Sequence, residues 1–430
     1  MKSIVLRWSD ALVDKVDTNA GMALEAMGEA LASAARAEPE TERVDVKVED
    51  LSKKDRADLE RRTEFIVSEP LPLTLLRPFQ ADPDAQPQQI EVEGPLDGRS
   101  EAVAAGLVVP DEQGGYVTWG VKAVNAAASA FSGDNVTVAV LDTGIDLAHP
   151  AFDDPALKII RQNFTRTADG DTNGHGTHCA GTIFGRPVHG VRIGVAPGIR
   201  RALIGKVLPA DSADLVSALN WAAREEAHVI SMSLGFDYPR LLELLRDQMP
   251  APAATAQALT HFRRNILIFE TLIASLKAQS IGGAGSVFVA ATGNASSRTA
   301  TAPARPYTVT ASPPASTTGF VPVAALGPGA NGLQIASFSN TAALVAAPGV
   351  GVLSARAGTK DLIELQGTSM ACPHVAGVAA LYWDKFIAGR KGLATADSVL
   401  ACIQAHATLD PINVRSRDAL DVGNGIVTAP

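Results

Sequence analysis

The sequence has few cysteines and no long hydrophobic run, and both absences exclude whole classes of protein. Its 430 residues include only three cysteines, Cys179, Cys372 and Cys402. An odd and sparse set cannot provide a disulfide framework for a chain of this size. No apolar stretch approaches the ~20 residues of a membrane-spanning helix, and Arg7 and Asp10 fall where a secretory leader needs an apolar core. We therefore expect a cytoplasmic protein without a membrane partner, with secretion by another route or after loss of a leader as the alternative.

Negative charge is concentrated at the front of the chain. Residues 1–112 hold 13 Lys and Arg against 24 Asp and Glu, whereas residues 113–430 hold 24 against 22. An acidic front argues against nucleic acid as a partner. The uneven distribution also indicates two modules, so we predict a domain boundary near residue 112.

The first module has the mixed pattern of a small α+β unit. Alternating and apolar runs predict strands, apolar residues at helical spacing predict helices, and polar or proline-broken stretches predict extended or linking segments. The predicted strands are 3–8 and 44–51, the helices 21–36 and 52–62 (capped by Ser52), the extended segment 64–79 and the linker 81–89.

From about residue 114, apolar runs alternate with helical segments. The runs are 135–142, 201–208, 228–235, 286–293 and 307–312. Near-continuous apolar strands between helices are typical of a parallel sheet covered on both faces, which predicts an α/β fold. Function in such sheets gathers at the carboxyl ends of the strands, and Asp142 and Asn294 lie at two of these ends.

Three motifs carry an acid, a base and a hydroxyl group. Asp142 lies in VAVLDTGID, His175 in NGHGTHCAGT and Ser369 in GTSMACPHVAG. A carboxylate can orient an imidazole that titrates near neutrality, and the imidazole can activate a serine. Gly144 permits a sharp turn after the aspartate, and the serine opens a helix whose free N–H groups favour a developing oxyanion.

Together, and in the order Asp, His, Ser, these motifs resemble those of the subtilisin-like serine proteases, the subtilases. The resemblance covers roughly residues 115–390. It implies a mostly parallel sheet with helices on both faces, preceded here by the α+β unit as a pro-segment. It also implies catalytic roles for Asp142, His175 and Ser369, with Asn294 of ATGN as the side-chain oxyanion donor.

The same resemblance implies a substrate-binding edge strand at SMSLG, residues 231–235. Extended peptides bind such an edge by strand addition. The residues expected at the substrate are Ser231, Ser233, Leu234 and Gly235, with Ala291, Thr292 and Gly293. No acid occurs among them, which favours an apolar or mixed specificity. We predict that a part of the pro-segment within 90–115 lies extended in the cleft and pairs with this strand, as in an inhibited zymogen.

The sequence departs from the subtilase pattern at the tight calcium site. Arg186 and Pro187 occupy the loop FGRPVHGVRIG (184–194), and Ala151 stands where an aspartate ligand is common. Calcium prefers several oxygen ligands, so we expect that this site is lost and that no cofactor is needed. His178, Cys179 and His374 are interpreted as packed core residues, because they supply no clear tetrahedral metal set.

Residues 238–281 are longer than the single short helix usual for subtilases. YPRLLELLRDQMP predicts one helix ending before Pro250, and an apolar stripe follows at spacings of three and four. The stripe is either packed within one chain, or docks a protein partner or a second copy at 253–281.

The sequence favours a serine endopeptidase acting on polypeptides through an acyl-enzyme. A peptide ligase or cyclase, or a dedicated processing protease, uses the same acyl-enzyme and remains an alternative. The non-enzyme alternative is a capped, zymogen-like binding scaffold. Covalent labelling by a fluorophosphonate distinguishes an enzyme from a scaffold.

Overall fold

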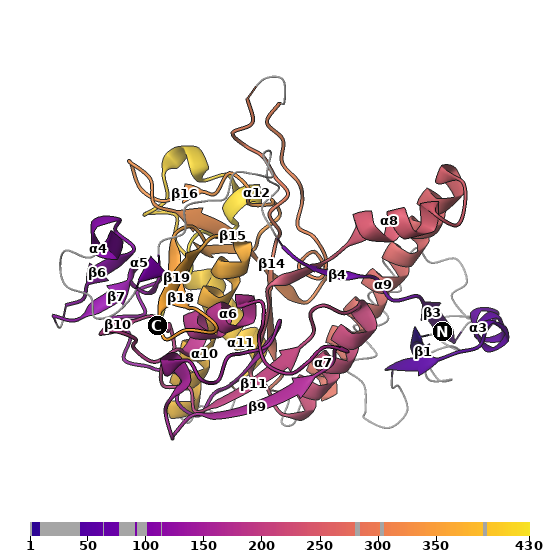
Figure 1. Cartoon of the computed structure of the whole chain (residues 1–430), viewed down its shortest axis with the longest axis horizontal. Coiled ribbons are helices and arrows are strands. Elements are labelled where there is room, and N and C mark those ends of the chain that lie inside the picture. The colour runs from indigo at the N-terminus through magenta and orange to yellow at the C-terminus, as the bar shows by residue number, and fades with distance from the viewer. Residues whose placement is uncertain are drawn as a thin grey trace.

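The computed structural model describes residues 2–8, 44–62, 64–76, 91–92, 101–112, 114–279, 284–301, 305–389 and 394–430 (Figure 1). The predicted helix 21–36 and linker 81–89 lie outside the described residues. Within the described ranges, no helix combines the length and the apolar character that crossing a membrane requires.

A central sheet organises the large domain. Its strand order is β16-β15-β14-β12-β8-β11-β9, with β17 also paired to β15, and only the β15–β16 pairing is antiparallel. The α/β fold with a mostly parallel sheet is thus confirmed. The strands are β8 (Thr137–Asp142), β9 (Lys158–Asn163), β11 (Arg201–Lys206), β12 (Val229–Met232), β14 (Val287–Ala291), β15 (Phe320–Gly327), β16 (Gln334–Ile335) and β17 (Val345–Pro348).

Helices cover both faces of this sheet, as the alternation along β8 shows. Val138 and Val140 belong to the buried cluster that includes α6 (His175–Phe184), α10 (Thr368–Ala388) and α11 (Ala396–His406). Ala139 and Leu141 belong to the cluster that includes α7 (Ser212–Arg224) and α9 (Ala251–Gln279). Successive side chains of a strand point to opposite faces, so each set of helices packs on its own side. The shorter elements are α5 (Trp119–Ala123), η1 (Pro150–Phe152), β10 (Val191–Arg192), β18 (Val352–Ala355), β19 (Leu362–Leu365), η3 (Val414–Ser416) and α12 (Ala419–Val422).

The amino-terminal unit is a small sheet packed on two helices of the large domain. β1 (Lys2–Trp8) lies between β2 (Val44–Asp50) and β3 (Phe65–Ser68), and α3 (Lys53–Glu60) begins with a capping box at Ser52. Ile4 and Leu6 of β1 share a buried cluster with Phe269 of α9. Figure 1 shows this unit beside α9. The predicted strands 3–8 and 44–51 and the capped helix 52–62 are therefore present.

The boundary predicted at residue 112 stays a prediction, although strands that precede it pair with strands of the large domain. β5 (Glu91–Val92) pairs with β19, and β6 (Val108–Pro110) pairs with β7 (Tyr116–Thr118), which joins β10 of the large domain. Figure 1 shows β6, β7 and α4 (Glu101–Ala104) at the opposite end of the molecule from β1 and β3. Strands on both sides of residue 112, β6 and β7, are therefore joined in one small sheet.

One predicted strand is wrong. Residues 307–312 form only isolated bridges, Ser297 with Tyr307 and Thr310 with Thr341. The neighbour of β14 in the sheet is instead β15, which begins at Phe320. The run 307–312 has the apolar, β-branched composition of a sheet strand, but its backbone bonds serve the loops around Ser297 and Asn340.

The region 238–281 folds as two helices, α8 (Tyr238–Arg246) and α9. Most of the apolar stripe of α9 is covered within the chain, since Ile268, Phe269, Leu272 and Ile273 are at most 2% exposed. Phe262 is half-buried, with its ring 5.5 Å from that of Tyr238. This burial favours packing within one chain, whereas docking at 253–281 stays a prediction that could use only the exposed start of the stripe at Leu259.

Phe269 and Leu259 of α9 provide a matched test of this packing. Phe269→Ala should lower the free energy of unfolding by about 3–5 kcal/mol, because it opens a cavity in the core. Leu259→Ala should change it by less than about 0.5 kcal/mol, since Leu259 is 52% exposed. Urea denaturation of both variants, in a Ser369→Ala background to prevent self-digestion, measures the difference. Equal losses, or sedimentation showing a concentration-dependent dimer that Leu259→Ala dissociates, would contradict the packing described.

Candidate active site

Asp142 ends β8 and is fully buried. The chain turns sharply after it at Gly144, where φ is +115° and an added Cβ would lie 2.5 Å from the carbonyl oxygen of Gly170. Glycine is required at such an approach. The Asp142 Oδ1 atom accepts a hydrogen bond from Thr143 N (2.7 Å) and lies 2.8 Å from His175 Nδ1. The predicted acid and imidazole are thus brought together.

His175 opens α6, and the helix then buries the neighbouring predicted core residues. His178 Nε2 lies 3.0 Å from the carbonyl oxygen of Val352, and burial lowers the His178 pKa to about 3. Burial also lowers the pKa of His374 to about 4, and its Nδ1 lies 2.8 Å from the carbonyl oxygen of Met370. Both rings are therefore neutral structural groups, and both are more deeply buried than the half-buried His175.

Cys179 lies between the histidine and the serine. Its Sγ is 3.8 Å from His175 Nδ1 and 3.5 Å from the carbonyl oxygen of Ser369. Burial, with a contribution from the Asp142 charge, raises the Cys179 pKa well above its ordinary value. Asp142, His175 and Cys179 have ligand atoms within 4.8 Å of one another. A protonated thiol is a poor metal ligand, so the set fits an acid–base pair better than a metal site.

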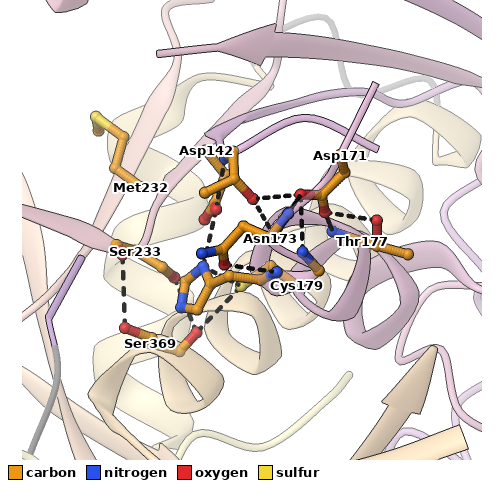
Figure 2. A network of polar contacts seen from close by, with 12 residues as sticks. Asp142, Asp171, Asn173, Thr177, Cys179, Met232, Ser233 and Ser369 are labelled. Carbon is orange, nitrogen blue, oxygen red and sulfur yellow. Dashed lines mark hydrogen bonds and ion pairs between the residues drawn. The ribbon is translucent and has the colours of Figure 1, made fainter. Parts of the chain in front are cut away.

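Ser369 is the second residue of α10 and is 1% exposed. Its Oγ lies 3.5 Å from the carbonyl oxygen of Ser233, while Ser233 Oγ donates a 2.8 Å hydrogen bond to the carbonyl oxygen of Ser369. Figure 2 shows these two residues facing each other beside the Asp142 network. Ser233 thus supports the first turn of the helix that carries the hydroxyl group.

Asn294 follows β14, and the residue before Ser369 fixes its amide. The Asn294 Oδ1 atom accepts hydrogen bonds from Thr368 N (2.9 Å) and Thr368 Oγ1 (2.8 Å). Because both partners donate, the oxygen must face Thr368 and the amide nitrogen must face away. The nitrogen donates a 2.6 Å hydrogen bond to the carbonyl oxygen of Leu76. The sequence did not point to Thr368, although its position beside the predicted serine could have done so.

An amino-terminal segment lies along the edge strand. β4 (Leu73–Leu75) pairs antiparallel with β13 (Leu234–Phe236), Leu75 opposite Leu234. β4 also has a backbone hydrogen bond outside this pair, in which Leu73 N donates to the carbonyl oxygen of Ala210 (3.1 Å). The described strands within 90–115, β5 and β6, pair elsewhere, so for them the prediction of pairing with this edge strand is wrong; residues 93–100 and 113 lie outside the described residues. The segment paired with β13 is 73–75, within the stretch 64–79 whose prolines indicated an extended chain.

Apart from Ser233, described above, the predicted pocket residues divide into three groups. Leu234 and Gly235 border the amino-terminal segment, and a Cβ added to Gly235 would lie 2.6 Å from Leu76 Cδ2. Ser231, expected at the substrate, is instead buried under α10, its Oγ 3.5 Å from Cys372 Sγ. Alternation along β12 turns it into the core. Ala291, Thr292 and Gly293 lie at the end of β14. Ala291 is the last residue of the strand, Thr292 Oγ1 donates to the carbonyl oxygen of Val323, and Gly293 N donates to Thr368 Oγ1.

Comparison with known proteins agrees with this geometry. Residues 133–416 match the subtilase family. The chain is 34% identical to a cuticle-degrading serine protease of Arthrobotrys oligospora over 58% of this chain and 52% of that protein. It is 33% identical to subtilisin BL of Lederbergia lenta over 63% of this chain and 85% of that protein. It is 31% identical to the major intracellular serine protease of Bacillus subtilis over 61% of this chain and 72% of that protein.

The chain therefore belongs to the subtilase family of subtilisin-like serine proteases. It spans about half the length of the Arthrobotrys relative and most of subtilisin BL.

The burial of two thiols gives a direct test of the site. Cys179 and Cys372 are buried and Cys402 is half-buried. Burial raises the Cys372 pKa to about 11, so both buried thiols stay protonated and shielded near neutral pH. Ellman's reagent should titrate one fast thiol in the native protein and three after unfolding, and none fast in Cys402→Ser. Two fast native thiols would contradict the packing around His175.

Proposed function

We propose that the chain is a serine endopeptidase in which Ser369 is the nucleophile. The Ser369 Oγ atom adds to the peptide carbonyl carbon, and His175 accepts the hydroxyl proton and later gives it to the leaving amine. Asp142 orients His175 and stabilises the imidazolium. The His175–Asp142 contact of 2.8 Å supports this assignment.

The Asn294 amide supplies the oxyanion donor in this proposal. Negative charge develops on the carbonyl oxygen as Ser369 adds, so a fixed donor at that oxygen stabilises the transition state more than the substrate. The observation that carries the proposal is that Asn294 already donates to a peptide carbonyl, that of Leu76, at the end of a strand paired with β13. Such a donor typically contributes ~3–4 kcal/mol.

We further propose that residues 1–76 form an inhibitory pro-segment cleaved after Leu76. In this step a bond forms between Ser369 Oγ and the Leu76 carbonyl carbon, the bond to Arg77 N breaks, and His175 protonates the new amine. Water then releases the Leu76 carboxylate. Polar contacts would hold the pro-segment on the enzyme: Asn265 Nδ2 donates to Ser68 Oγ (2.9 Å), and Lys2 Nζ lies 2.9 Å from Asp211.

The same geometry supports an apolar residue before the scissile bond. The Leu76 side chain packs against Gly235 and the edge of the main core cluster. Leu73 is also buried, and Leu75 is half-buried. An extended peptide with leucine-like residues at these positions therefore fits the cleft as its polypeptide substrate.

We propose that the calcium-site loop needs no calcium, because an arginine occupies its oxygen acceptors. Arg186 donates from Nε to Asp154 Oδ2 (2.7 Å), from Nη1 to the Phe184 carbonyl (2.9 Å) and from Nη2 to the Ile199 carbonyl (2.8 Å). Ala151 offers no side-chain oxygen. The residues present therefore do not fit a calcium ion at this loop.

Replacing Ser369 by Ala tests the proposed mechanism. Casein hydrolysis and fluorophosphonate labelling should both be lost. Any residual hydrolysis should not exceed the rate that substrate binding and oxyanion stabilisation give by themselves. In subtilisin itself, a member of this family, that rate is ~10³–10⁴-fold above the uncatalysed reaction in water. Ser217→Ala, in the middle of α7, should keep both activities. Casein hydrolysis by Ser369→Ala at the unchanged rate would remove Ser369 from the mechanism.

Chelation tests the calcium proposal. EDTA should leave the Tm unchanged, whereas Arg186→Ala should cost about 2 kcal/mol or more of unfolding free energy, because it leaves buried acceptors unpaired. Arg200→Ala removes a largely exposed ion pair with Asp134 and should cost less than about 1 kcal/mol. A fall in Tm with EDTA that calcium restores would refute the proposal.

A further inference from the structure

Asp171 lies four residues before His175, and the mechanism above gives it no task. Its two carboxylate oxygens accept five hydrogen bonds. Oδ1 accepts from Thr143 Oγ1 (2.9 Å), Asn173 N (3.1 Å) and Gly174 N (2.9 Å), and Oδ2 accepts from Thr177 N (2.9 Å) and Thr177 Oγ1 (2.6 Å). Figure 2 shows Asp171 joined to Asn173 and Thr177, next to Asp142.

These donors belong to the two segments that carry the acid–base pair. Thr143 directly follows Asp142, while Gly174 and Thr177 flank His175. Thr143 Oγ1 also accepts a 2.9 Å hydrogen bond from Gly176 N, which ties the two segments a second time. One carboxylate thus fixes the backbone on both sides of the 2.8 Å contact between Asp142 and His175.

These hydrogen bonds stabilise the ionised form of the Asp171 carboxylate. Burial alone would raise its pKa, but the hydrogen bonds from Thr177, Gly174 and Thr143 outweigh burial and lower the pKa below its usual value. The side chain is therefore ionised at neutral pH. Hydrogen bonds to an ionised acceptor are roughly twice as strong as neutral ones, so the five contacts form a stiff frame.

Lys206 holds the same loop from its other side. It ends β11 opposite Asp142 in the parallel register and is 6% exposed. Its ammonium donates to the carbonyl oxygens of Ala168 (2.7 Å) and Gly170 (3.0 Å). The close approach of Gly144 to Gly170 completes the contact between this loop and the turn after Asp142. The loop therefore cannot shift without moving that turn.

We propose that Asp171 is a positioning residue that sets the geometry of the Asp142–His175 pair through Thr143 and Thr177. It does not touch the substrate, which lies along β13. The inference rests on the proposed roles of Asp142 and His175. Loss of the frame should slow proton transfer, because small displacements of reacting groups cost up to ~10²-fold in rate, while substrate binding is unaffected.

Asp171→Asn is the sharpest variant, since it keeps the shape and one oxygen. An amide placed at the Oδ2 position turns N–H groups toward the two Thr177 donors and breaks those contacts. We expect kcat per active site to fall ~10–100-fold with KM unchanged. The acid limb of the kcat/KM profile should move to lower pH, because a negative charge that favours imidazolium has been removed.

The measurement is steady-state hydrolysis of a leucine-containing peptide by protein expressed as the full chain and left to complete its own processing, with active sites counted by fluorophosphonate titration. Asp169→Asn is the control, since Asp169 accepts a 2.9 Å hydrogen bond from Asn163 in an exposed part of the loop; it should retain the wild-type kcat and pH profile. The variants leave the other titratable neighbours of His175 unchanged, namely Asp142, Cys179 and His178.

A purely structural role would lower the Tm and the fraction of titratable sites, but leave kcat per site and the acid limb unchanged. That result overturns the proposal. If Asp171→Asn does not fold, Thr177→Val removes only the hydroxyl contacts and should give a smaller fall in kcat at constant KM; no fall would equally overturn it. Failure of the proposed function is distinct, because Ser369→Ala would then retain activity.

Discussion

The parallel direction of β8, β12 and β14 is the constraint on which the site depends. Parallel neighbours end at one edge of the sheet, so residues far apart in sequence emerge side by side. Asp142 ends β8, Ser233 follows β12 and Asn294 follows β14. α10 then packs over β12 and β14 with Ser369 in its first turn. The chemistry is therefore built by strand ends and helix starts, with the loops limited to fine adjustment.

The loop bearing Asp171 and the residue Thr368 show how that adjustment is made. Each acts on a reactive group through a short polar contact: Thr368 orients the Asn294 amide, and Asp171 joins the turn after Asp142 to the start of α6. The same hydrogen-bonding logic appears at Arg186, whose guanidinium satisfies acceptors that would suit a cation. In each case a buried polar group is satisfied and also holds a neighbour in place.

The site residues that could be predicted from the sequence are those whose position depends on local chemistry. Asp142, His175 and Asn294 stand in motifs whose glycines, strand ends and helix starts are visible in one dimension, and the structure brings them to one place. The predictions were wrong where a segment's structure depends on pairing with strands distant in sequence. Residues 307–312 have β propensity but no strand partner, and Ser231 faces the core because of the register of β12. Asp171 does not stand out in the sequence, since its importance lies in donors from two segments.

The amino-terminal segment illustrates the same limit. Charge separated residues 1–112 from the rest, yet β5 and β6 pair with strands of the large domain, and the strand paired with β13 is β4. Strand addition is sequence-tolerant, because main-chain hydrogen bonds supply the affinity. The sequence therefore allows several extended segments to pair with β13. The structure shows that β4 does so and that the carbonyl oxygen of Leu76 lies at the Asn294 amide.

The most direct test of the account is the amino terminus of the purified protein, determined by intact mass and terminal sequencing. The account predicts that active protein acquires a new terminus at Arg77, whereas Ser369→Ala remains a single chain of 44.6 kDa. Processing within 90–115 with the Leu76–Arg77 bond intact, or cleavage after Leu76 in Ser369→Ala purified away from other proteases, would contradict it.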